Sequence, residues 1–346
     1  MPRRPHRAST MTALTLAALS LTAATTATAA SSAPAGSAQA TRTTVKVSTA
    51  AELTAALAAA QPGETIQLAA GTYSGAFTGT VNGTAGAPIT LSGPSSAVLT
   101  NGDSSGDLGA GYGFHLEANY WTLSGFSVDA SAKGVVLDHA DYDVLTGLTV
   151  HDIADEGIHL REFSSYDTVQ HSAVYDTGVK APGYGEGVYI GTAQSNWGTY
   201  TGGQPDLSDN DQVLDNTFGP DIAAENIDAK EATSGGLISG NTFSGKGESG
   251  ANSSTDVVAV KGDDYTVSDN TMTNGLVDGF EVEQLYAKSG CGNVFKGNTI
   301  DLGASGYGFH VKDQSDCAAD PNVVGTSNTV TDATKGASSI PETPGI

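Results

Sequence analysis

Two short sequence phrases recur along most of this 346-residue chain, and each keeps a fixed order of apolar and polar positions. The first joins two strand-like segments through a polar pair, and its copies begin at Thr122, Val144, Thr168, Gln212, Leu237, Thr266 and Val294. Successive copies begin 22, 24, 44, 25, 29 and 28 residues apart, and the spacing of 44 indicates either two turns or one turn with a long insertion. Such a period is typical of a solenoid, in which each unit buries its apolar side against the next.

The second phrase alternates with the first and reads as a short strand with an apolar residue at every other position. Its eight copies place sixteen residues on one side, and all sixteen are apolar. The pairs are Phe114 and Leu116, Val135 and Leu137, Ile158 and Leu160, Val188 and Ile190, Ile227 and Ala229, Val258 and Val260, Phe280 and Val282, and Phe309 and Val311. An α-helix would not keep a period of two through eight copies. We therefore predict an all-β fold in which two kinds of strand alternate and the coils stack into a parallel β-helix.

Polar residues mark the corners and one end of this solenoid. Thr49 and Glu52 form a capping box that predicts a short helix carrying Leu53 and Leu57. This helix would cap the N-terminal end, because both ends of a solenoid need a cap. Asparagines follow strands at equivalent corners, where each side-chain amide is expected to bond to the next coil. These asparagines are Asn216, Asn241, Asn270, Asn298 and Asn328.

These features resemble the pectin-lyase-like superfamily of right-handed β-helix proteins over residues 45–335. The resemblance rests on the capping helix before the segment PGETIQLAAGTY, on the corner phrases GNT and DNT, and on the alternating strands that begin with glycine. It implies a single-stranded right-handed parallel β-helix with an N-terminal capping helix, which holds an extended polysaccharide along one face. Lyases, hydrolases, epimerases and non-enzymatic adhesins share this fold, so the resemblance does not choose the reaction.

The N-terminus predicts export. Three arginines precede an apolar run at residues 11–21 and an Ala-Thr-Ala cleavage site, so residues 1–29 are predicted to be a signal peptide. Residues 30–44 are predicted to be a disordered linker, because they are rich in Ala, Ser, Thr and Gly, and residues 336–346 a C-terminal tail. The chain has no second long apolar run, so we do not expect it to insert in a membrane. We expect a secreted, extracellular protein that is a monomer.

Charge and cysteine content narrow the partners and the compartment further. The net charge is −23, and an acidic surface of this size disfavours nucleic acid and anionic membranes as partners. Cys291 and Cys317 are the only cysteines and lie 26 residues apart, which is about one coil. In an exported protein they are predicted to form one disulfide between neighbouring coils.

The outward residues of the second phrase would form two columns if the coils stack in register. The first column contains His115, Val136, His159, Tyr189, Asp228, Ala259, Glu281 and His310. The second contains Glu117, Asp138, Arg161, Gly191, Lys230, Lys261, Glu283 and Lys312. Four basic residues in the second column predict a local cationic stripe on an acidic protein, and such a stripe suits an anionic ligand because the local field matters most at contact distance.

A polysaccharide of uronic acids suits this face. A lyase must remove the proton α to a carboxylate and stabilise the developing enolate with a cation. In related β-helix lyases Lys or Arg commonly acts as the base, so the resemblance implies Lys230 and Arg161 as the catalytic pair, with the sugar held over the gap left by Gly191. His159 and Tyr189 lie beside that gap, and if Lys230 is not the base, Arg161, His159 and Tyr189 remain the alternatives.

Further residues are expected to bind the substrate or a metal. Lys261, Lys312 and His310 are predicted to bind the polysaccharide. Trp197, in an insertion at residues 191–211, is predicted to stack on sugars. Carboxylate oxygens suit calcium as a cofactor. The predicted calcium ligands are Asp228, Glu281 and Glu283.

Two other functions stay open on the sequence alone. A glycoside hydrolase would pair Asp228 with Glu281 or Glu283 and would not need the basic stripe. A non-catalytic glycan-binding β-helix would lose affinity on substitution but would have no turnover to lose. The leading hypothesis is a lyase that cleaves an acidic polysaccharide by β-elimination.

Overall fold

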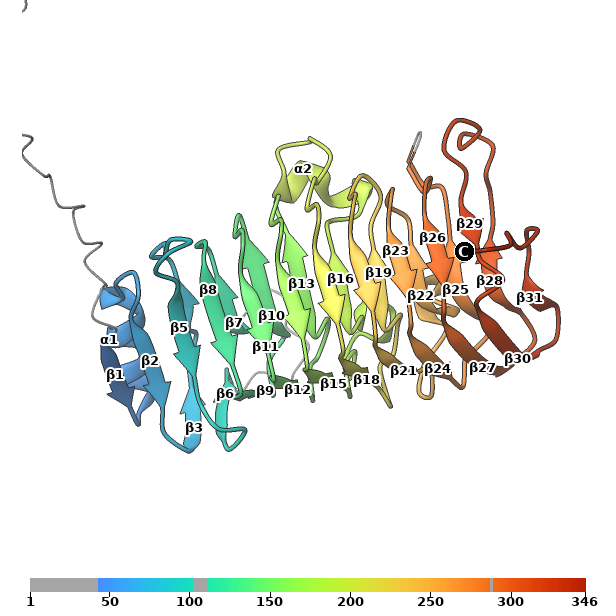
Figure 1. The fold of residues 1–346 in the computed structure, drawn as a ribbon. Helices are drawn as coiled ribbons and strands as arrows, with labels where there is room; N and C mark the ends of the chain where they lie inside the picture. The colour runs from blue at the N-terminus through green and yellow to red at the C-terminus, as the bar shows by residue number, and fades with distance from the viewer. Residues whose placement is uncertain (1–42, 102–110, 287–288) are drawn as a thin grey trace, which may run out of the picture. The chain divides into compact units, whose positions relative to one another are not determined.

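The computed structural model describes residues 43–101, 111–286 and 289–346. Within these residues the strands form three parallel sheets, and the coils lie side by side from β1 to β31 as a right-handed parallel β-helix (Figure 1). The predicted signal peptide and most of the predicted linker lie outside the described residues. No helix in the described part of the chain is long and apolar enough to cross a membrane.

We name the three sheets A, B and C. Sheet A contains β1 (Thr44–Val47), β2 (Thr65–Leu68), β5 (Ile89–Ser92), β8 (Trp121–Ser124), β11 (Val144–Thr146), β14 (Thr168–Gln170), β17 (Gln212–Leu214), β20 (Leu237–Ser239), β23 (Thr266–Ser268), β26 (Val294–Lys296) and β29 (Val323–Val324). Sheet B contains β3 (Gly71–Ser74), β6 (Ala97–Thr100), β9 (Ser127–Asp129), β12 (Thr149–Val150), β15 (Ala173–Val174), β18 (Thr217–Phe218), β21 (Thr242–Ser244), β24 (Thr271–Thr273), β27 (Thr299–Ala304) and β30 (Thr329–Ala333).

Sheet C is formed by the second sequence phrase and carries the site described below. It contains β4 (Thr78–Gly79), β7 (Tyr112–Leu116), β10 (Lys133–Asp138), β13 (Ile158–Arg161), β16 (Val188–Ile190), β19 (Ile227–Ala229), β22 (Asp256–Val260), β25 (Asp278–Val282), β28 (Tyr307–Val311) and β31 (Gly336–Ser338). The helices are α1 (Ala50–Ala59) and α2 (Trp197–Tyr200), with 3₁₀ turns η1 (Pro182–Tyr184), η2 (Gln194–Asn196) and η3 (Ala251–Ser253).

Each coil has three strands, one more than the two kinds predicted. The first phrase bends at its polar pair, so that β8 and β9 belong to sheets A and B on either side of Gly125, whose φ of +83° suits glycine. The spacing of 44 residues is one coil with an insertion, because Thr168 pairs directly with Gln212. The insertion leaves sheet C after β16 and carries α2, which stands at one edge of the coils in Figure 1.

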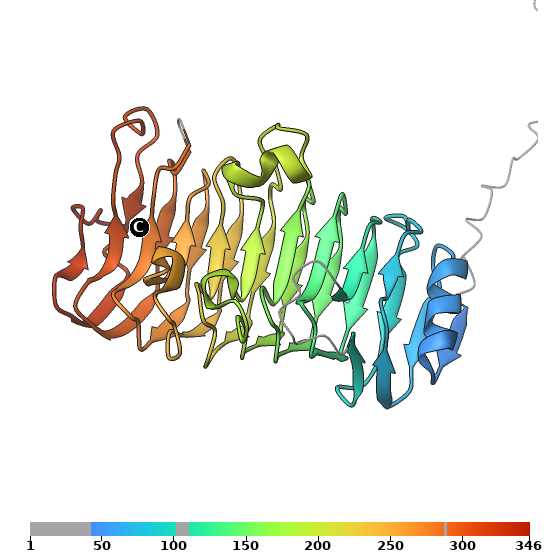
Figure 2. The ribbon, with the colours of Figure 1, turned by 180° about the vertical axis from the view of Figure 1, so that it is seen from behind.

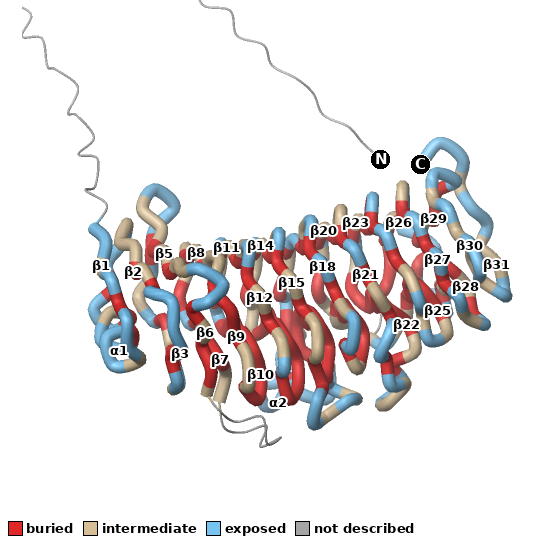
Figure 3. Tube along the Cα trace, turned by 90° about the horizontal axis from the view of Figure 1, so that it is seen from below, coloured by how far each residue is buried: buried red, intermediate tan, exposed pale blue. Residues whose placement is uncertain are grey.

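The predicted inward register of sheet C is confirmed. Each of the sixteen inward side chains is at most 7 % exposed, including Phe280 and Val282 at 1 % each. Neighbouring coils place like positions together, as in the pairing of Val135 with Ile158. Figure 3 shows the buried residues running through successive coils, so one continuous core supports the outer face of sheet C.

Asparagines form the predicted ladder between sheets A and B. Asn241 accepts the backbone N–H of Asn216 on its Oδ1 at 2.9 Å and donates its Nδ2 to the carbonyl of Val213 at 2.8 Å. The same pattern runs through the remaining members, Asn270, Asn298 and Asn328. The ladder therefore replaces backbone bonds that the corner breaks.

The ends and the cross-link also follow the sequence. Leu53 and Leu57 of α1 are buried, and Figure 2 shows α1 against the first coils. Glu52 donates its backbone N–H to the Thr49 hydroxyl, while its carboxylate accepts from Ser48. The predicted disulfide joins Cys291 and Cys317. Strand β31 pairs with β28, so the sheet extends past the expected end of the domain at residue 335.

Candidate active site

The outer face of sheet C carries the predicted first column in register, and we call it the central column because outward residues lie on both sides of it. The pairing runs from Val136 through His159 to Tyr189, and from there to Asp228. It continues through Ala259 and Glu281 to His310. The basic residues of the second column lie at the ends of these strands or directly after them. Arg161, the last residue of β13, pairs with Asp138 of the previous coil.

Sheet C also has a third outward column, which the two-column prediction leaves out. Its members lie two residues before the first inward residue of each strand: Tyr112, Lys133, Glu156, Glu186, Glu225, Asp256, Asp278 and Tyr307. Five successive coils therefore contribute a carboxylic acid at the same position. A strict period of two misses this column, because its next outward position falls on the residue, usually glycine, just before the first inward residue. A Cβ on Gly113 or Gly134 would meet Val128 or Val150 of the core, so the alternation breaks at these glycines.

A cavity of about 420 Å³ lies over β13, β16 and β19. All four predicted catalytic residues line it: His159, Arg161, Tyr189 and Lys230. Lys133, Asp155, Glu156 and Glu186 complete the side chains from sheet C and the turns before it. The side where these strands end is lined by the insertion, through Thr192, Ala193, Ser195, Asn196 and Tyr200. Tyr184 of η1 and Asn252 of η3 lie on the side where the strands begin.

The insertion presents a different aromatic residue from the one predicted. Trp197 is only 5 % exposed, donates its Nε1 to the carbonyl of Thr192 at 2.7 Å and packs edge-on against Tyr286. It therefore anchors the insertion and is not available to stack on a sugar. Tyr200 lines the cavity instead, with its ring 4.3 Å from the Arg161 guanidinium carbon.

Lys230 is held at the centre of this site by charge and by an aromatic ring. Its Nζ lies 2.6 Å from an Asp228 oxygen and 4.9 Å from the centre of the Tyr189 ring. Burial lowers the pKa of Lys230, but Asp228, Glu225 and Glu186 outweigh burial and raise it above its usual range. Lys230 therefore rests as an ammonium.

Tyr189 and His159 both rest as neutral groups. Burial, followed by the nearby Asp228 carboxylate, raises the pKa of Tyr189 well above its usual value. Burial lowers the pKa of His159 to about 3, with Arg161 and Lys133 acting in the same direction. The two rings meet edge-on with their centres 4.4 Å apart.

The hydrogen bonds of His159 define its tautomer. Its Nε2 lies 2.9 Å from the carbonyl of Gly191, so a neutral ring donates there and Nδ1 carries no proton. Nδ1 is fully buried and has no hydrogen-bonding partner in the described residues, with the nearest Glu156 oxygen at 3.6 Å. His159 therefore lines the cavity and fixes the Gly191 carbonyl through this hydrogen bond.

Arg161 is fixed by Asp138. Its Nε and Nη2 donate to the two Asp138 oxygens at 2.6 and 3.1 Å, and Nη2 also donates to the Tyr112 hydroxyl at 2.9 Å. Burial lowers the pKa of Arg161, but these bonds to Asp138 outweigh it and raise the pKa further. Arg161 is thus a permanent cation and not a base.

The expected gap at Gly191 is filled by the protein. A Cβ placed on Gly191 would lie 2.5 Å from a Thr233 methyl group, and the φ of +75° also favours glycine. Gly191 allows the chain to turn and its carbonyl to meet His159, but it leaves no space for a sugar. The cavity instead lies beside Lys230 and Tyr189.

The predicted cationic stripe is neutralised by acidic neighbours. Lys261 is buried, and its Nζ lies 2.8 Å from both Asp228 oxygens. Lys312 pairs with Glu281 at 2.6 Å and with Glu283 at 3.5 Å. Neither lysine lines the cavity, so the stripe does not act as one open cationic surface.

The predicted calcium ligands are not brought together. Asp228 and Glu281 lie two coils apart, with Ala259 between them in the register. Two ammonium groups already surround Asp228, so Asp228 does not fit a calcium site. Glu283 is one-third exposed and pairs with Lys312.

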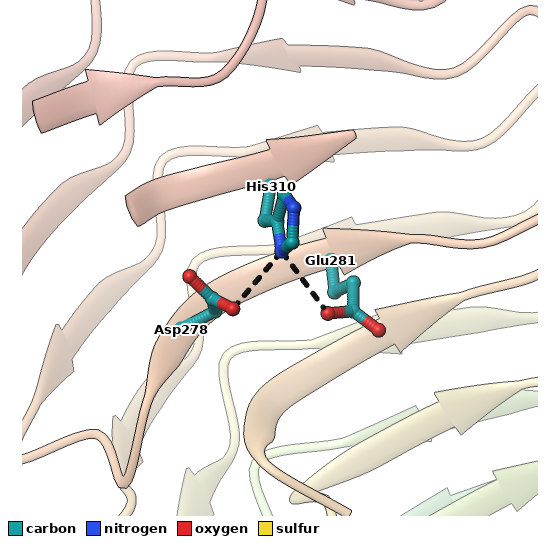
Figure 4. Close-up of side chains that lie close together, drawn as sticks. All are labelled: Asp278, Glu281 and His310. Atoms are coloured by element: carbon teal, nitrogen blue, oxygen red, sulfur yellow. Dashed lines mark hydrogen bonds and ion pairs between the residues drawn. The ribbon is translucent and has the colours of Figure 1, made fainter. Parts of the chain in front are cut away.

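A separate cluster lies on β25 and β28. The Nδ1 atom of His310 lies 2.9 Å from Asp278 and 3.4 Å from Glu281 (Figure 4). His310 was predicted to bind the polysaccharide, but its ring turns toward these two carboxylates. The cluster does not line the cavity over β13, β16 and β19.

Comparisons with known proteins match this fold. A family profile described as "Pel9A-like, right handed beta helix region" matches residues 31–196, and one described as "Right handed beta helix region" matches residues 206–340. An alginate lyase from Paenibacillus sp. str. FPU-7 superposes with a TM-score of 0.78 at 33% identity, covering 85% of this chain and 97% of that chain. No curated protein matches the sequence.

Two more distant structures share the fold alone. The pectate lyase Pel9A has a TM-score of 0.61 at 19% identity, covering 81% of this chain and 72% of that chain. The mannuronan C-5 epimerase AlgE4 A-module from Azotobacter vinelandii has a TM-score of 0.51 at 13% identity, covering 84% and 93%. One relative is thus one-third identical over nearly its whole length, and the register and corners follow the β-helix pattern. The chain belongs to the pectin-lyase-like superfamily of right-handed β-helix polysaccharide lyases.

Proposed function

We propose that this protein is a secreted lyase that cleaves a 4-linked polyuronate, with alginate as the first candidate, by β-elimination in the cavity over β13, β16 and β19. The observation that carries the proposal is the contact between Lys230 and Tyr189, in which the Lys230 Nζ lies 4.9 Å from the centre of the Tyr189 ring in a walled cavity. Alginate is preferred because the relative at 33% identity is an alginate lyase. The predicted signal peptide supports secretion.

The reaction needs a base, an acid and a fixed positive charge. The base takes the C5 proton of a uronate, which is α to its carboxylate. The electron pair of that C–H bond then forms the C4–C5 double bond, and the bond from C4 to the glycosidic oxygen breaks. The departing oxygen takes a proton from the acid, while a cation stabilises the enolate that develops on the carboxylate.

Geometry favours Lys230 over His159 as the proposed base. A base must come within hydrogen-bonding distance of the proton that it removes. The Lys230 side chain is 12% exposed at the cavity, whereas the free nitrogen of His159 is fully buried. Lys230 must lose its resting proton to act, and Asp228 opposes that loss. The proposal therefore predicts turnover that rises toward alkaline pH.

Tyr189 and Arg161 supply the other two functions. Tyr189 keeps its phenolic proton because burial raises its pKa, so it is the proposed donor to the departing oxygen. Arg161 lines the cavity and keeps Nη1 free of hydrogen bonds within the described residues, so this nitrogen can bind the uronate carboxylate. In this proposal the Arg161 guanidinium supplies the positive charge that calcium was expected to supply.

Product chemistry tests the proposal directly. The untagged mature chain should release products with a C4–C5 double bond from alginate, detected by their ultraviolet absorbance, and smaller amounts or none from pectate and neutral glucans. Tyr189→Phe should lower turnover by at least about 10²-fold, because it removes the proton donor and leaves the ring. Tyr307→Phe is the matched control, since Tyr307 lies near Lys335 at the C-terminal end of sheet C.

The alternatives give different products. New reducing ends without a double bond would identify a hydrolase. Saturable binding of every polymer without chain cleavage would identify a glycan-binding protein. A Tyr189→Phe variant with parental turnover would leave β-elimination standing but would remove Tyr189 from it.

A further inference from the structure

The cluster on β25 and β28 has the composition of a metal site rather than of a sugar site. Asp278, Glu281 and His310 each offer one ligand atom, and these atoms all lie within 4.8 Å of one another (Figure 4). They come from two neighbouring coils, since Glu281 pairs with His310 in the register. The Asp278 carboxylate is oriented by its other oxygen, which accepts the backbone N–H of Tyr307 at 2.6 Å.

The separations between the donor atoms match those around a small divalent ion. A tetrahedral ion with bonds of about 2.0–2.2 Å separates its ligand atoms by roughly 3.3–3.6 Å. His310 Nδ1 lies 2.9 Å from Asp278 Oδ2 and 3.4 Å from Glu281 Oε2. The third separation, between the Asp278 and Glu281 oxygens, is at most 4.8 Å, so side-chain adjustments of about 1 Å or less would let one ion contact all three atoms.

Two buried oxygens on this part of the sheet lack a hydrogen bond. Glu281 is only 2% exposed, yet its Oε2, which faces His310, has no hydrogen-bonding partner in the described residues. Asp256 is equally buried, and its Oδ2 is also unpartnered. An unsatisfied buried carboxylate oxygen is costly, and a bound cation would relieve that cost.

We propose that Asp278, Glu281 and His310 bind a zinc-type divalent ion that ties β25 to β28. The imidazole nitrogen selects this class, because nitrogen ligands suit zinc whereas calcium takes oxygen ligands. The His310 side chain is 22% exposed, so an ion can reach the cluster from solvent and keep a water as its fourth ligand. The site is separate from the proposed catalytic cavity.

Lys312 allows a metal site to be distinguished from a simple network of ion pairs. Its Nζ lies 2.6 Å from the other oxygen of Glu281, where it competes with a cation for the same carboxylate. The side chain is 36% exposed and can turn into solvent. Lys312→Ala should therefore tighten zinc binding several-fold. If the cluster is only a network of ion pairs around His310, this substitution will create no zinc site.

Calorimetric titration of the untagged, chelator-treated mature chain with zinc chloride alone tests the site. The expected result is one saturable site, weakened at least about tenfold by His310→Ala and by Glu281→Gln, the second of which keeps the shape of the side chain. Calcium chloride should give no such binding. His115→Ala is the matched control, because His115 lies in the same column and contacts a single carboxylate, that of Asp138.

Three results would overturn the proposal. They are the absence of a one-to-one site, equal zinc affinity in the His310→Ala and parental chains, and tighter binding of calcium than of zinc. Circular dichroism of each variant before titration separates a lost ligand from a lost fold. If His310→Ala does not fold, Glu281→Gln and Lys312→Ala still decide the matter, because their expected effects have opposite signs.

Discussion

The central and C-terminal stretches of sheet C carry the same three columns but different surroundings. In the central stretch (β13, β16 and β19), Lys230 lies in a walled cavity with its side chain 12% exposed. In the C-terminal stretch (β22, β25 and β28), Lys312 occupies the same column with its side chain 36% exposed. Both lysines contact a carboxylate of the central column, Asp228 or Glu281, at 2.6 Å.

The difference comes from segments outside the repeat. The insertion after β16 contributes Tyr200 to the cavity, and η1 and η3 contribute Tyr184 and Asn252 from the opposite side. Charges act more strongly where such walls exclude water, because the effective dielectric constant falls. The repeat thus places acidic, aromatic and basic side chains along the whole sheet. The segments outside the repeat determine which coils lie in a walled cavity, where these side chains can act in catalysis.

The largest expected difference between the stretches is catalytic. Lys230→Ala should lower turnover of the preferred polyuronate by about 10²–10⁴-fold, the usual contribution of a general base. Initial rates of unsaturated product formation measure it. Lys335→Ala is the matched control, because Lys335 also lies over a tyrosine ring, 5.4 Å from Tyr307, but at the C-terminal end. Parental turnover in Lys230→Ala would move the site away from the central stretch.

The next expected difference concerns stability. Asp228 is 1% exposed and lies between the ammonium groups of Lys230 and Lys261, so Asp228→Asn leaves two buried cations without their carboxylate. Removing one partner of a buried ion pair costs about 3–5 kcal/mol. Glu281→Gln should cost less, because Lys312 can reach solvent. Denaturant unfolding of both variants without metal tests the order, and equal losses would remove the distinction between the two stretches.

The pH dependence of turnover sharpens the assignment of the base. Only the neutral amine of Lys230 can accept a proton, and Asp228 raises its pKa above the usual range. Turnover should therefore rise by about tenfold per pH unit on the alkaline side of neutrality until the protein unfolds. Asp228→Asn should move this rise to lower pH, because the carboxylate that favours the ammonium is gone. A rate that is independent of pH there would exclude Lys230 as the base.

The repeat made the register and the corners predictable. Phe280 and Val282 point inward because residues two apart in a strand lie on the same face and both are apolar. Asn241 and Asn270 stack because each coil returns to the same corner. The four residues predicted to be catalytic share one cavity for the same reason. Periodicity fixes which residues are neighbours across coils, so these features needed no knowledge of the loops.

What the sequence left open depends on side-chain direction and on loops. Trp197 lies in the predicted insertion, but only the path of the chain shows that the ring turns inward and that Tyr200 turns to the cavity. The cationic stripe was predicted from residue type, whereas Asp228 and Asp138 neutralise it through contacts that spacing does not show.

A second ladder shows the same limit. Asp143, Asp167 and Asp211 stack before sheet A, each accepting the backbone N–H of the coil before it. Burial raises the pKa of Asp143 to about 8 and those of the other two well above their usual value. In a sequence, aspartates suggest surface charge. Here they are buried and accept backbone N–H groups between coils, as the asparagines do in the ladder between sheets A and B.

The smallest expected effect belongs to Lys312 in catalysis. Lys312 lies three coils from Lys230, which is about 14 Å at the usual strand spacing. Charges at that distance are largely screened at 0.1 M salt, where the Debye length is about 10 Å. Lys312→Ala should therefore change turnover and affinity for a short oligouronate by less than about threefold. The same variant should lose affinity for a long polymer at low salt, if the chain extends along sheet C toward β28. Comparing the two substrates at two salt concentrations measures this, and a large loss with the short substrate would extend the catalytic site beyond its walls.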